Sequence, residues 1–529
     1  MKGRIPYFFR FAPIIFLLIA SSCSRRQYHD DTPVLAKVGD VVITEKSFIE
    51  SYSFGPSFLK SVDGAKESYL QAMINEAVLA QLPQVQEKKS GEYVQKSMRL
   101  LKQELLVEKM FNVEVGGKVS VSEEEIREAI ARSAIENRVK YLYTDDLNEA
   151  RRFKAELDSG ADFDSLLENK LGHLGIAVEN GETDFIGYGE LQEPFNETIY
   201  CLKPSEISPI ISHGKGYFII KKVASRRRIL AESDFAQYRH RYEQVIRYKK
   251  DRRQTGRFLK EFMDPKEVVV DGKIFNVLAR TFHSLIHTAI QDSGFQQTPS
   301  LPEPLSFRQI SEQLADYYDE PAVRFKDGHW TVRELLYHLS YRPLDLRAAE
   351  FTELAGKLRT IIGRTIRDVC LEEEALKRNY DRDPEIRYQL DRWERKHTTQ
   401  VFIDSVKNIC QPELSNVESL YEKTAYAQNV EFDQVVSHLT GLLTMKMTQD
   451  RLMELAESSE IEVILHPEHL NAVRVDEPRA GRLPDVKLYK LGLPYLREAF
   501  PTPDPLWGAE EILERLTRSS DEELINKKQ

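Results

Sequence analysis

The chain lacks the residue patterns that mark most enzyme classes. It has only 4 cysteines in 529 residues, and their spacing matches no metal or redox motif. It has no glycine-rich phosphate loop, no H-E-x-x-H pair and no G-x-S-x-G elbow. It also lacks a basic excess, because 74 Lys and Arg stand against 84 Asp and Glu. We therefore expect no metal site, no cofactor and no nucleic-acid partner.

Long hydrophobic runs are confined to the first residues. Lys2, Arg4 and Arg10 form a positive region, and residues 11–20 form an apolar stretch too short to cross a bilayer as a stable helix. The stretch ends in A-S-S-C at Cys23, which resembles a bacterial lipobox with alanine in place of the usual leucine. The resemblance implies that Cys23 is lipidated and anchors the chain to the inner or outer membrane, facing the periplasm or exterior. An ordinary secretory peptide or an uncleaved anchor is the alternative.

The other cysteines and the acidic runs suggest structural roles. Cys201 lies in an apolar run and is predicted to be buried. Cys370 and Cys410 could pair. The acidic runs at 123–125 and 372–374 occupy consecutive helical positions, so their side chains point in different directions. We interpret both runs as solvated helix faces and not as acid–base pairs.

Two stretches of the chain repeat one order of elements. Residues 35–44 and 323–331 each predict a hairpin that turns at Asp and Gly. Thr44 is predicted to cap the helix that follows the first hairpin. Later helices are predicted at 92–111, 358–379 and 384–406, capping boxes at Ser122 and Ser415, and strands at Val139 and Val430. The matching order indicates an internal duplication.

A basic segment separates the two copies. Residues 233–263 predict one long helix that carries many Arg and Lys side chains. This helix either binds acidic lipid headgroups or client segments, or is a solvated face with an apolar stripe packed on its neighbours. A strand at 268–270 and a further helix follow, then a proline-rich linker at 294–304. The tail after residue 475 is broken by prolines and predicts one short helix at 509–516.

Five ordered segments resemble the parvulin-type (PpiC, or rotamase) peptidyl-prolyl isomerases. They are V-K-Y-L-Y at 139–143, G-A-D-F-D-S-L at 160–166, G-E-T-D-F-I-G-Y-G-E-L-Q-E-P-F at 181–195, L-K-P-S-E-I-S at 202–208 and G-Y-F-I-I-K at 216–221. Together with the hairpin and helices ahead of it, this stretch also resembles the SurA, PpiD and PrsA class of extracytoplasmic foldases. The resemblance implies an isomerase fold inside a chaperone frame.

Both active-site histidines of the parvulin family are replaced in this chain. Tyr141 stands at the first histidine position and Phe218 at the second, while His213 lies where threonine is usual. Prolyl isomerisation needs no covalent chemistry, only tighter binding of the twisted amide, so these three remain the catalytic candidates. The resemblance places the family's peptide-binding pocket at Phe185, Leu191 and Phe195. The alternative is that these three form the domain core and that His213 is an exposed turn residue.

We expect an α+β protein with mostly helical, duplicated SurA-like modules and one parvulin α/β domain that has a small antiparallel sheet. The predicted divisions are a lipoprotein signal peptide (1–23), a helical module (24–136), a parvulin-like domain (137–225), a helix–strand–helix segment (226–292), a linker (293–305), a second module with a parvulin remnant (306–475) and a proline-rich tail (476–529).

The leading hypothesis is a lipid-anchored periplasmic foldase or chaperone with weak or no isomerase activity. Its partners would be unfolded or proline-containing polypeptides, such as outer-membrane protein precursors, whose strand edges and apolar side chains aggregate unless covered. Two alternatives stay open. One is an active peptidyl-prolyl cis-trans isomerase, and the other is a non-catalytic assembly or docking subunit.

Overall fold

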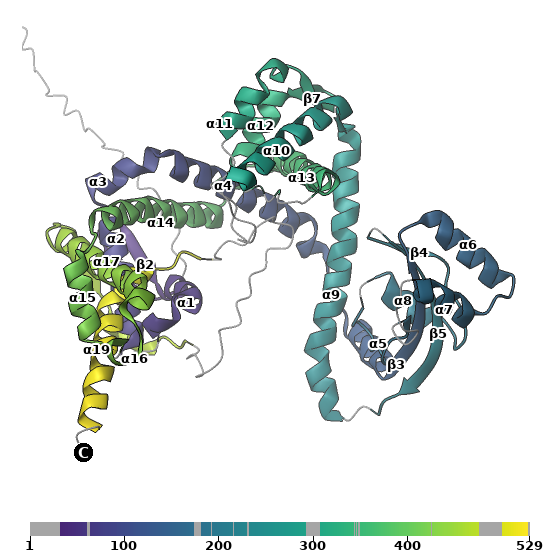
Figure 1. Cartoon of the computed structure of the whole chain (residues 1–529), viewed down its shortest axis with the longest axis horizontal. Helices are drawn as coiled ribbons and strands as arrows, with labels where there is room; N and C mark the ends of the chain where they lie inside the picture. Colours follow the sequence, from purple (N-terminus) through teal and green to yellow (C-terminus); the bar gives the residue numbers. More distant parts are fainter. Residues whose placement is uncertain are drawn as a thin grey trace, which may run out of the picture. The chain divides into compact units, whose positions relative to one another are not determined.

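The structure is a computed structural model that describes residues 32–60, 64–173, 181–191, 193–214, 216–229, 232–292, 307–342, 344, 346, 350–424, 426–475 and 500–526. Cys23, the predicted linker and residues 476–499 of the predicted tail lie outside the described residues. The chain divides into two compact units that interleave along the sequence (Figure 1). The first unit comprises residues 1–107, 276–316 and 333–529, and the second comprises 108–275 and 317–332.

The first unit is mostly helical. Its elements are β1 (Val34–Val38), β2 (Val41–Thr44), α1 (Glu45–Phe54), α2 (Ala65–Leu79), α3 (Pro83–Gln86), α11 (Phe307–Gln313), α13 (Phe351–Lys377), α14 (Pro384–Ile409), α15 (Leu414–Glu422), α16 (Tyr426–Asn429), α17 (Phe432–Glu457), β9 (Val463–Leu465), α18 (Pro467–Ala472) and α19 (Ala509–Asn526). Three helices have residues in both units: α4 (Glu92–Glu114), α10 (Gly272–Asp292) and α12 (Val332–Ser340).

The second unit contains two small sheets. Its elements are α5 (Glu123–Ser133), β3 (Ile135–Thr144), α6 (Leu147–Asp158), α7 (Phe163–His173), α8 (Phe195–Cys201), β4 (Ile211–His213), β5 (Gly216–Arg227), α9 (Glu232–Met263), β6 (Val269–Val270), β7 (Pro321–Phe325) and β8 (Gly328–Thr331). Helices dominate and the sheets are small and antiparallel, which agrees with the predicted α+β class. Among the residues described, no helix is both long and apolar enough to cross a membrane.

The first predicted hairpin is confirmed and gains a third strand from far along the chain. β1 pairs antiparallel with β2, and the turn between them uses Gly39 at φ +50°, a conformation that costs glycine little. The Thr44 side chain then caps α1 by accepting a hydrogen bond from the backbone N–H of Ser47. The other edge of β1 pairs with β9, where Lys37 lies opposite Ile464. The first hairpin therefore folds against a strand at the end of the second predicted copy.

The second predicted hairpin is confirmed in the same way. β7 and β8 pair antiparallel, and β6 adds to the free edge of β7, with Val270 opposite Val323. β6 follows the long basic helix of the first copy in sequence. The strand that completes the first hairpin thus comes from the end of the second predicted copy, and the strand that completes the second hairpin lies before that copy, although the duplication itself stays a prediction from sequence.

The basic helix α9 packs against α5 within the second unit. Tyr242 of α9 is 3% exposed and lies in one apolar cluster with Ile126 and Ile130 of α5. Lys250 pairs with Glu125 at 2.5 Å, and Glu125 also closes the predicted capping box at Ser122. The apolar stripe of α9 is therefore a packing face, as one of the two sequence interpretations proposed.

Three local predictions are wrong. The strand expected at Val430 is absent, because residues 432–457 form α17, whose Val435, Leu439 and Leu442 are buried at helical spacing. The capping box expected at Ser415 does not form, since α15 begins at Leu414 with Glu413 at its N-cap position. Cys201 is exposed and free. It lies at the end of α8, whose buried face is formed by Asn196 and Ile199.

The second acidic run is not solvated as expected. Glu372 of α13 is 2% exposed. Its carboxylate accepts a hydrogen bond from Gln103 Nε2 at 2.7 Å and pairs with the guanidinium of Arg99. Gln103 in turn accepts a hydrogen bond from Arg342, which pairs with Asp368. The run is structural, as predicted, but through a buried network that joins α4 to α13 inside the first unit.

Candidate peptide-binding site

A three-stranded antiparallel sheet in the order β3-β5-β4 carries the candidate site. In its register, Leu142 lies opposite Ile219 and Tyr143 lies opposite Phe218. Successive side chains of a strand point to opposite faces, so Leu142 and Ile219 share one face, while Tyr143 and Phe218 share the other.

One face of this sheet is sealed by helices. Leu142 and Ile219 are 2% and 1% exposed, and they pack with Phe153 of α6 and Phe163 of α7. Helix α7 begins inside the G-A-D-F-D-S-L segment at 160–166. This face is a closed core, so the opposite face is the one available to a ligand.

The opposite face carries a half-exposed group of four rings, named here the aromatic cluster: Tyr143, Phe195, His213 and Phe218. The Phe218 ring centroid lies 4.9 Å from that of Tyr143 and 4.9 Å from that of Phe195. The His213 ring also contacts Phe195, with ring centroids 5.0 Å apart. Tyr143 is 46% exposed, and the other three are half-buried. The cluster therefore presents aromatic surface to solvent above a buried base.

The base of the aromatic cluster is apolar. Val139, Ile199, Leu202, Ile211 and Ile220 are buried beneath it, and Tyr141, Ile186 and Leu191 pack against these five with Phe195 and Phe218. Gly216 leaves room for the Tyr143 ring, because a Cβ at this position would collide with it. The buried base and the space left by Gly216 thus support the aromatic cluster from below.

A buried lysine fixes the helix that carries Phe195. Lys222 of β5 is 5% exposed, and its ammonium donates hydrogen bonds to the carbonyl oxygens of Ile199 at 3.1 Å and Leu202 at 2.8 Å. These carbonyls lie at the C-terminal end of α8, where helix carbonyls lack partners within the helix. Burial lowers the pKa of Lys222. The lysine therefore positions α8, and through it the Phe195 ring, without reaching the aromatic cluster itself.

The structure brings together some of the predicted site residues. Phe195, Phe218 and His213 lie in the aromatic cluster. Tyr141 and Leu191 lie half-buried in the apolar base.

Phe185 lies elsewhere, under the guanidinium groups of Arg138 at 4.8 Å and Arg226 at 4.1 Å from its ring centroid. Its neighbour Ile186 joins the base instead. The backbone of Ile186 bridges to Asn137 of β3, which decides which of the two side chains faces the site.

Sequence reasoning missed Tyr143. The signal was present in V-K-Y-L-Y, because Tyr143 stands two positions after Tyr141 on a strand and must share its face. Its contact with Phe218 depends on the pairing of β3 with β5, which the separate segments do not specify.

The aromatic cluster suits the binding of apolar rings more than proton transfer. Three of its members are phenyl or phenol rings, which offer flat apolar surface for a prolyl or aromatic side chain. At the two positions where the parvulin family has histidines, Tyr141 and Phe218 supply aromatic surface. The aromatic cluster therefore offers exposed apolar surface with one polar ring, that of His213, beside Phe195.

The family models searched contain no match to this chain. Among curated proteins, the chain is similar to the foldase protein PrsA of Geobacillus kaustophilus, with 23% identity over 217 residues, which cover 40% of this chain and 76% of that protein. It is also similar to the peptidyl-prolyl cis-trans isomerase Pin1 of Digitalis lanata, with 32% identity over 78 residues, which cover 15% of this chain and 66% of that protein.

Among solved structures, the chain matches PrsA of Bacillus anthracis with 20% identity, a TM-score of 0.20, and coverage of 36% of this chain and 96% of that one. A structure described for SurA-like chaperones of Campylobacter jejuni matches with 16% identity, a TM-score of 0.21, and coverage of 44% and 97%. The curated relatives confirm the resemblance to PrsA foldases and to parvulin-type isomerases that the five sequence segments indicated. The similarity leaves more than half of this chain without a counterpart in the PrsA of G. kaustophilus.

Proposed function

We propose that the chain is an extracytoplasmic foldase that acts mainly as a chaperone. Its clients are unfolded polypeptides, and their apolar or proline-containing segments bind at the aromatic cluster. The observation that carries this proposal is the half-exposed group of Tyr143, Phe195, His213 and Phe218 on the open face of the parvulin sheet. The foldase relatives support the same role.

Binding without strong catalysis follows from the residues at the two histidine positions. A catalyst of prolyl isomerisation must bind the twisted amide more tightly than either planar form. Flat rings at Tyr141 and Phe218 bind the prolyl ring in both planar forms about equally, which holds a client but does little to lower the barrier. A chaperone that uses no nucleotide gains from such weak, adaptable binding over a large surface.

The proposed location is the cell envelope, with a lipid on Cys23 as the membrane anchor. This rests on the lipobox-like A-S-S-C at residues 20–23, which lies outside the described residues. Replacing Cys23 with Ala should release the chain from the membrane fraction. Continued sedimentation of the variant with membranes would contradict lipidation.

The chaperone role is tested by the aggregation of a denatured outer-membrane barrel protein. The full chain, at equimolar amounts, should suppress light scattering, and Phe195→Ala should lose most of that effect. Tyr143→Ala should weaken it too, whereas Tyr248→Ala, which removes a tyrosine of similar exposure (47%) from α9, should not. Equal suppression by all three variants would exclude the aromatic cluster as the client site.

A second candidate function is active peptidyl-prolyl isomerisation. The ring contact between His213 and Phe195 at 5.0 Å favours it, because it keeps one polar ring in the aromatic cluster. Proline-limited refolding of a model substrate separates the two functions. Acceleration at catalytic amounts that is lost in both Phe195→Ala and His213→Ala would establish the enzyme. No acceleration at a large excess of the chain would exclude it.

The remaining alternative is an assembly or docking subunit. Capture from envelope extract distinguishes it, because a chaperone should retain many unfolded clients in substoichiometric amounts. Recovery of one folded partner at a fixed stoichiometry would replace the chaperone proposal with the docking subunit.

A further inference from the structure

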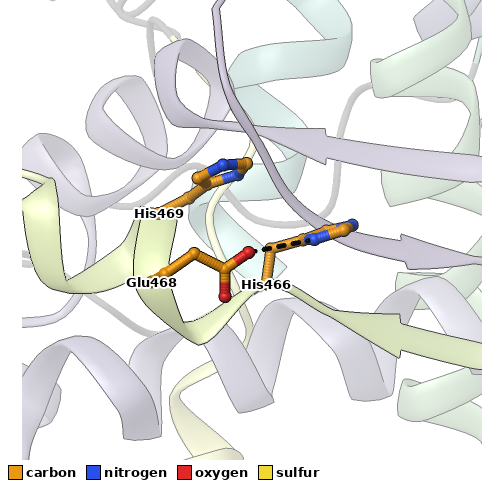
Figure 2. Close-up of side chains that lie close together, drawn as sticks. All are labelled: His466, Glu468 and His469. Atoms are coloured by element: carbon orange, nitrogen blue, oxygen red, sulfur yellow. Dashed lines mark ion pairs between the residues drawn. The ribbon is translucent and has the colours of Figure 1, made fainter.

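Three potential metal ligands gather where the last strand of the first unit leads into a short helix. β9 ends at Leu465, His466 occupies the N-cap position of α18, and Glu468 and His469 lie in the first turn. Each offers a ligand atom, and these atoms all lie within 4.8 Å of one another. Figure 2 shows the carboxylate of Glu468 beside the ring of His466, with the His469 ring on the same side of the helix. The shared location follows from the sequence H-P-E-H, in which Pro467 starts the helix.

Two distances define this group. His466 Nδ1 lies 3.4 Å from a carboxylate oxygen of Glu468. The ring centroids of His466 and His469 lie 5.3 Å apart, with ring planes 21° from parallel. A carboxylate and two imidazoles therefore share one small surface site.

The second ring is oriented by the backbone of a distant strand. His469 Nδ1 lies 2.7 Å from the carbonyl oxygen of Val34 in β1. A carbonyl oxygen only accepts hydrogen bonds, so Nδ1 of the neutral ring carries the proton and Nε2 keeps its lone pair. Metal-binding histidines are commonly oriented in this way, by a backbone carbonyl that accepts from the nitrogen facing away from the metal.

We propose that His466, Glu468 and His469 form a zinc-binding site on the surface of the first unit. Two imidazoles and one carboxylate are a ligand set that suits Zn²⁺, whereas Ca²⁺ and Mg²⁺ favour sites made of oxygen ligands. Three protein ligands leave the fourth tetrahedral position to water. This site was not anticipated from the sequence, which predicted none because its cysteines show no metal spacing and it has no H-E-x-x-H pair.

The geometry requires only side-chain movement to close around an ion. Bonds of about 2.0–2.1 Å to zinc place neighbouring ligand atoms roughly 3.3 Å apart in a tetrahedron. The His466–Glu468 distance of 3.4 Å already meets this value. The side chains of His466 and Glu468 are 37% and 66% exposed, so they can rotate toward Nε2 of His469 without disturbing the core.

Zinc at this site would fasten the first hairpin to the end of the second copy. The backbone N–H of His466 donates to the carbonyl of Leu35 at 2.9 Å, and His469 holds the carbonyl of Val34. Leu35 is completely buried, and β1 pairs with β9 along this edge. An ion that fixes both histidines would therefore stabilise the pairing of β1 with β9.

The test is calorimetric titration of the untagged full chain with ZnCl₂ at pH 7.5, in a buffer that does not chelate. We expect one equivalent of tight binding and, with Co²⁺ in place of Zn²⁺, the visible absorption of a tetrahedral site. His466→Ala should weaken zinc binding about tenfold or more, while leaving the Val34 contact in place. Glu468→Gln should weaken it less, because it removes charge and keeps an oxygen ligand.

A histidine pair elsewhere provides the matched control. His283 and His287 of α10 lie one helical turn apart, with ring centroids separated by 6.2 Å. The double variant His283→Ala, His287→Ala should bind zinc as the unchanged chain does. Loss of zinc binding in this control with retention in His466→Ala would overturn the proposal. Failure of the unchanged chain to bind zinc in this titration would also overturn it.

Discussion

The guanidinium of Arg342 and the carboxylate of Asp368 lie 3.1 Å apart, and only 4% of each side chain is exposed. Asp368 also accepts a hydrogen bond from Arg367, and Arg342 donates one to Gln103 of α4. The pair is therefore removed from water but has several partners. Removing one charge of a buried pair is costly, since the other charge then lies buried without compensation.

We expect Asp368→Asn to destabilise the first unit by about 3–5 kcal/mol. Urea unfolding followed by tryptophan fluorescence measures the loss, because Trp393 and Trp507 both lie in this unit. Asp404→Asn is the control: Asp404 is 57% exposed, and its loss should change stability by less than about 0.5 kcal/mol. Equal losses of unfolding free energy in the two variants would show that the buried pair contributes no more to stability than an exposed carboxylate does.

Lys222 should be required for the stability of the helix that carries Phe195. Replacing it with Met keeps much of its volume but removes both hydrogen bonds to the carbonyls at the end of α8. We expect a loss of about 1–3 kcal/mol, seen as faster amide hydrogen exchange in α8 and β5. Lys203→Met, on the exposed loop after α8, should leave the exchange unchanged.

Phe218 should contribute to client binding through its two ring contacts. Phe218→Leu retains an apolar side chain but loses the contacts with Tyr143 and Phe195, and each such contact contributes about 0.5–1.5 kcal/mol. We expect the affinity for an unfolded, proline-containing peptide to fall about threefold to tenfold, measured by fluorescence anisotropy. Phe111→Leu loses a ring contact with Phe258 away from the aromatic cluster and should bind the peptide normally.

His338 should make the first unit sensitive to acid. Burial, and then the charges of Arg99 and Arg342, lower the pKa of His338 to about 4. Between pH 6.5 and 4 the unfolded chain binds a proton that the folded chain excludes, so stability falls as pH decreases through this window.

We expect the His338→Gln variant to lose less stability than the unchanged chain between pH 7 and pH 4.5. The difference should be about 1–2 kcal/mol, because the half-buried ring is partly screened by solvent. Urea midpoints at pH 7, 5.5 and 4.5 measure it. Parallel pH profiles of the two proteins would contradict the role of His338.

Local elements were predictable where a short motif fixes them. The first hairpin and its Thr44 cap, the capping box at Ser122 and the start of α14 at Pro384 all form as expected. Each depends on residues within one or two turns of one another, so the sequence pattern contains most of the information. The strand predicted at Val430 failed because four alternating residues are too short to outweigh the helical spacing that follows them.

The candidate site was predictable only in part. The parvulin-like segments located Phe195 and Phe218, and the alignment between the last two segments located His213; these three do lie together. Two features could not be predicted: Ile186, and not Phe185, packs in the apolar base, and Tyr143 joins the aromatic cluster. Both depend on how β3 pairs with β5 and with the loop at Ile186. A shift of one residue in such a pairing turns a side chain to the opposite face.

By itself, the sequence determined the two hairpins, most of the helices and the five segments that resemble parvulin-type isomerases, with aromatic residues at the family's two histidine positions, because these follow from local periodicity and short motifs. Only the tertiary structure decided that β9 completes the first hairpin while β6 completes the second. It also placed the carbonyl of Val34 beside His469. These contacts join segments that lie from about 50 to more than 400 residues apart, and they are selected by the burial of complementary surfaces, which no local pattern records.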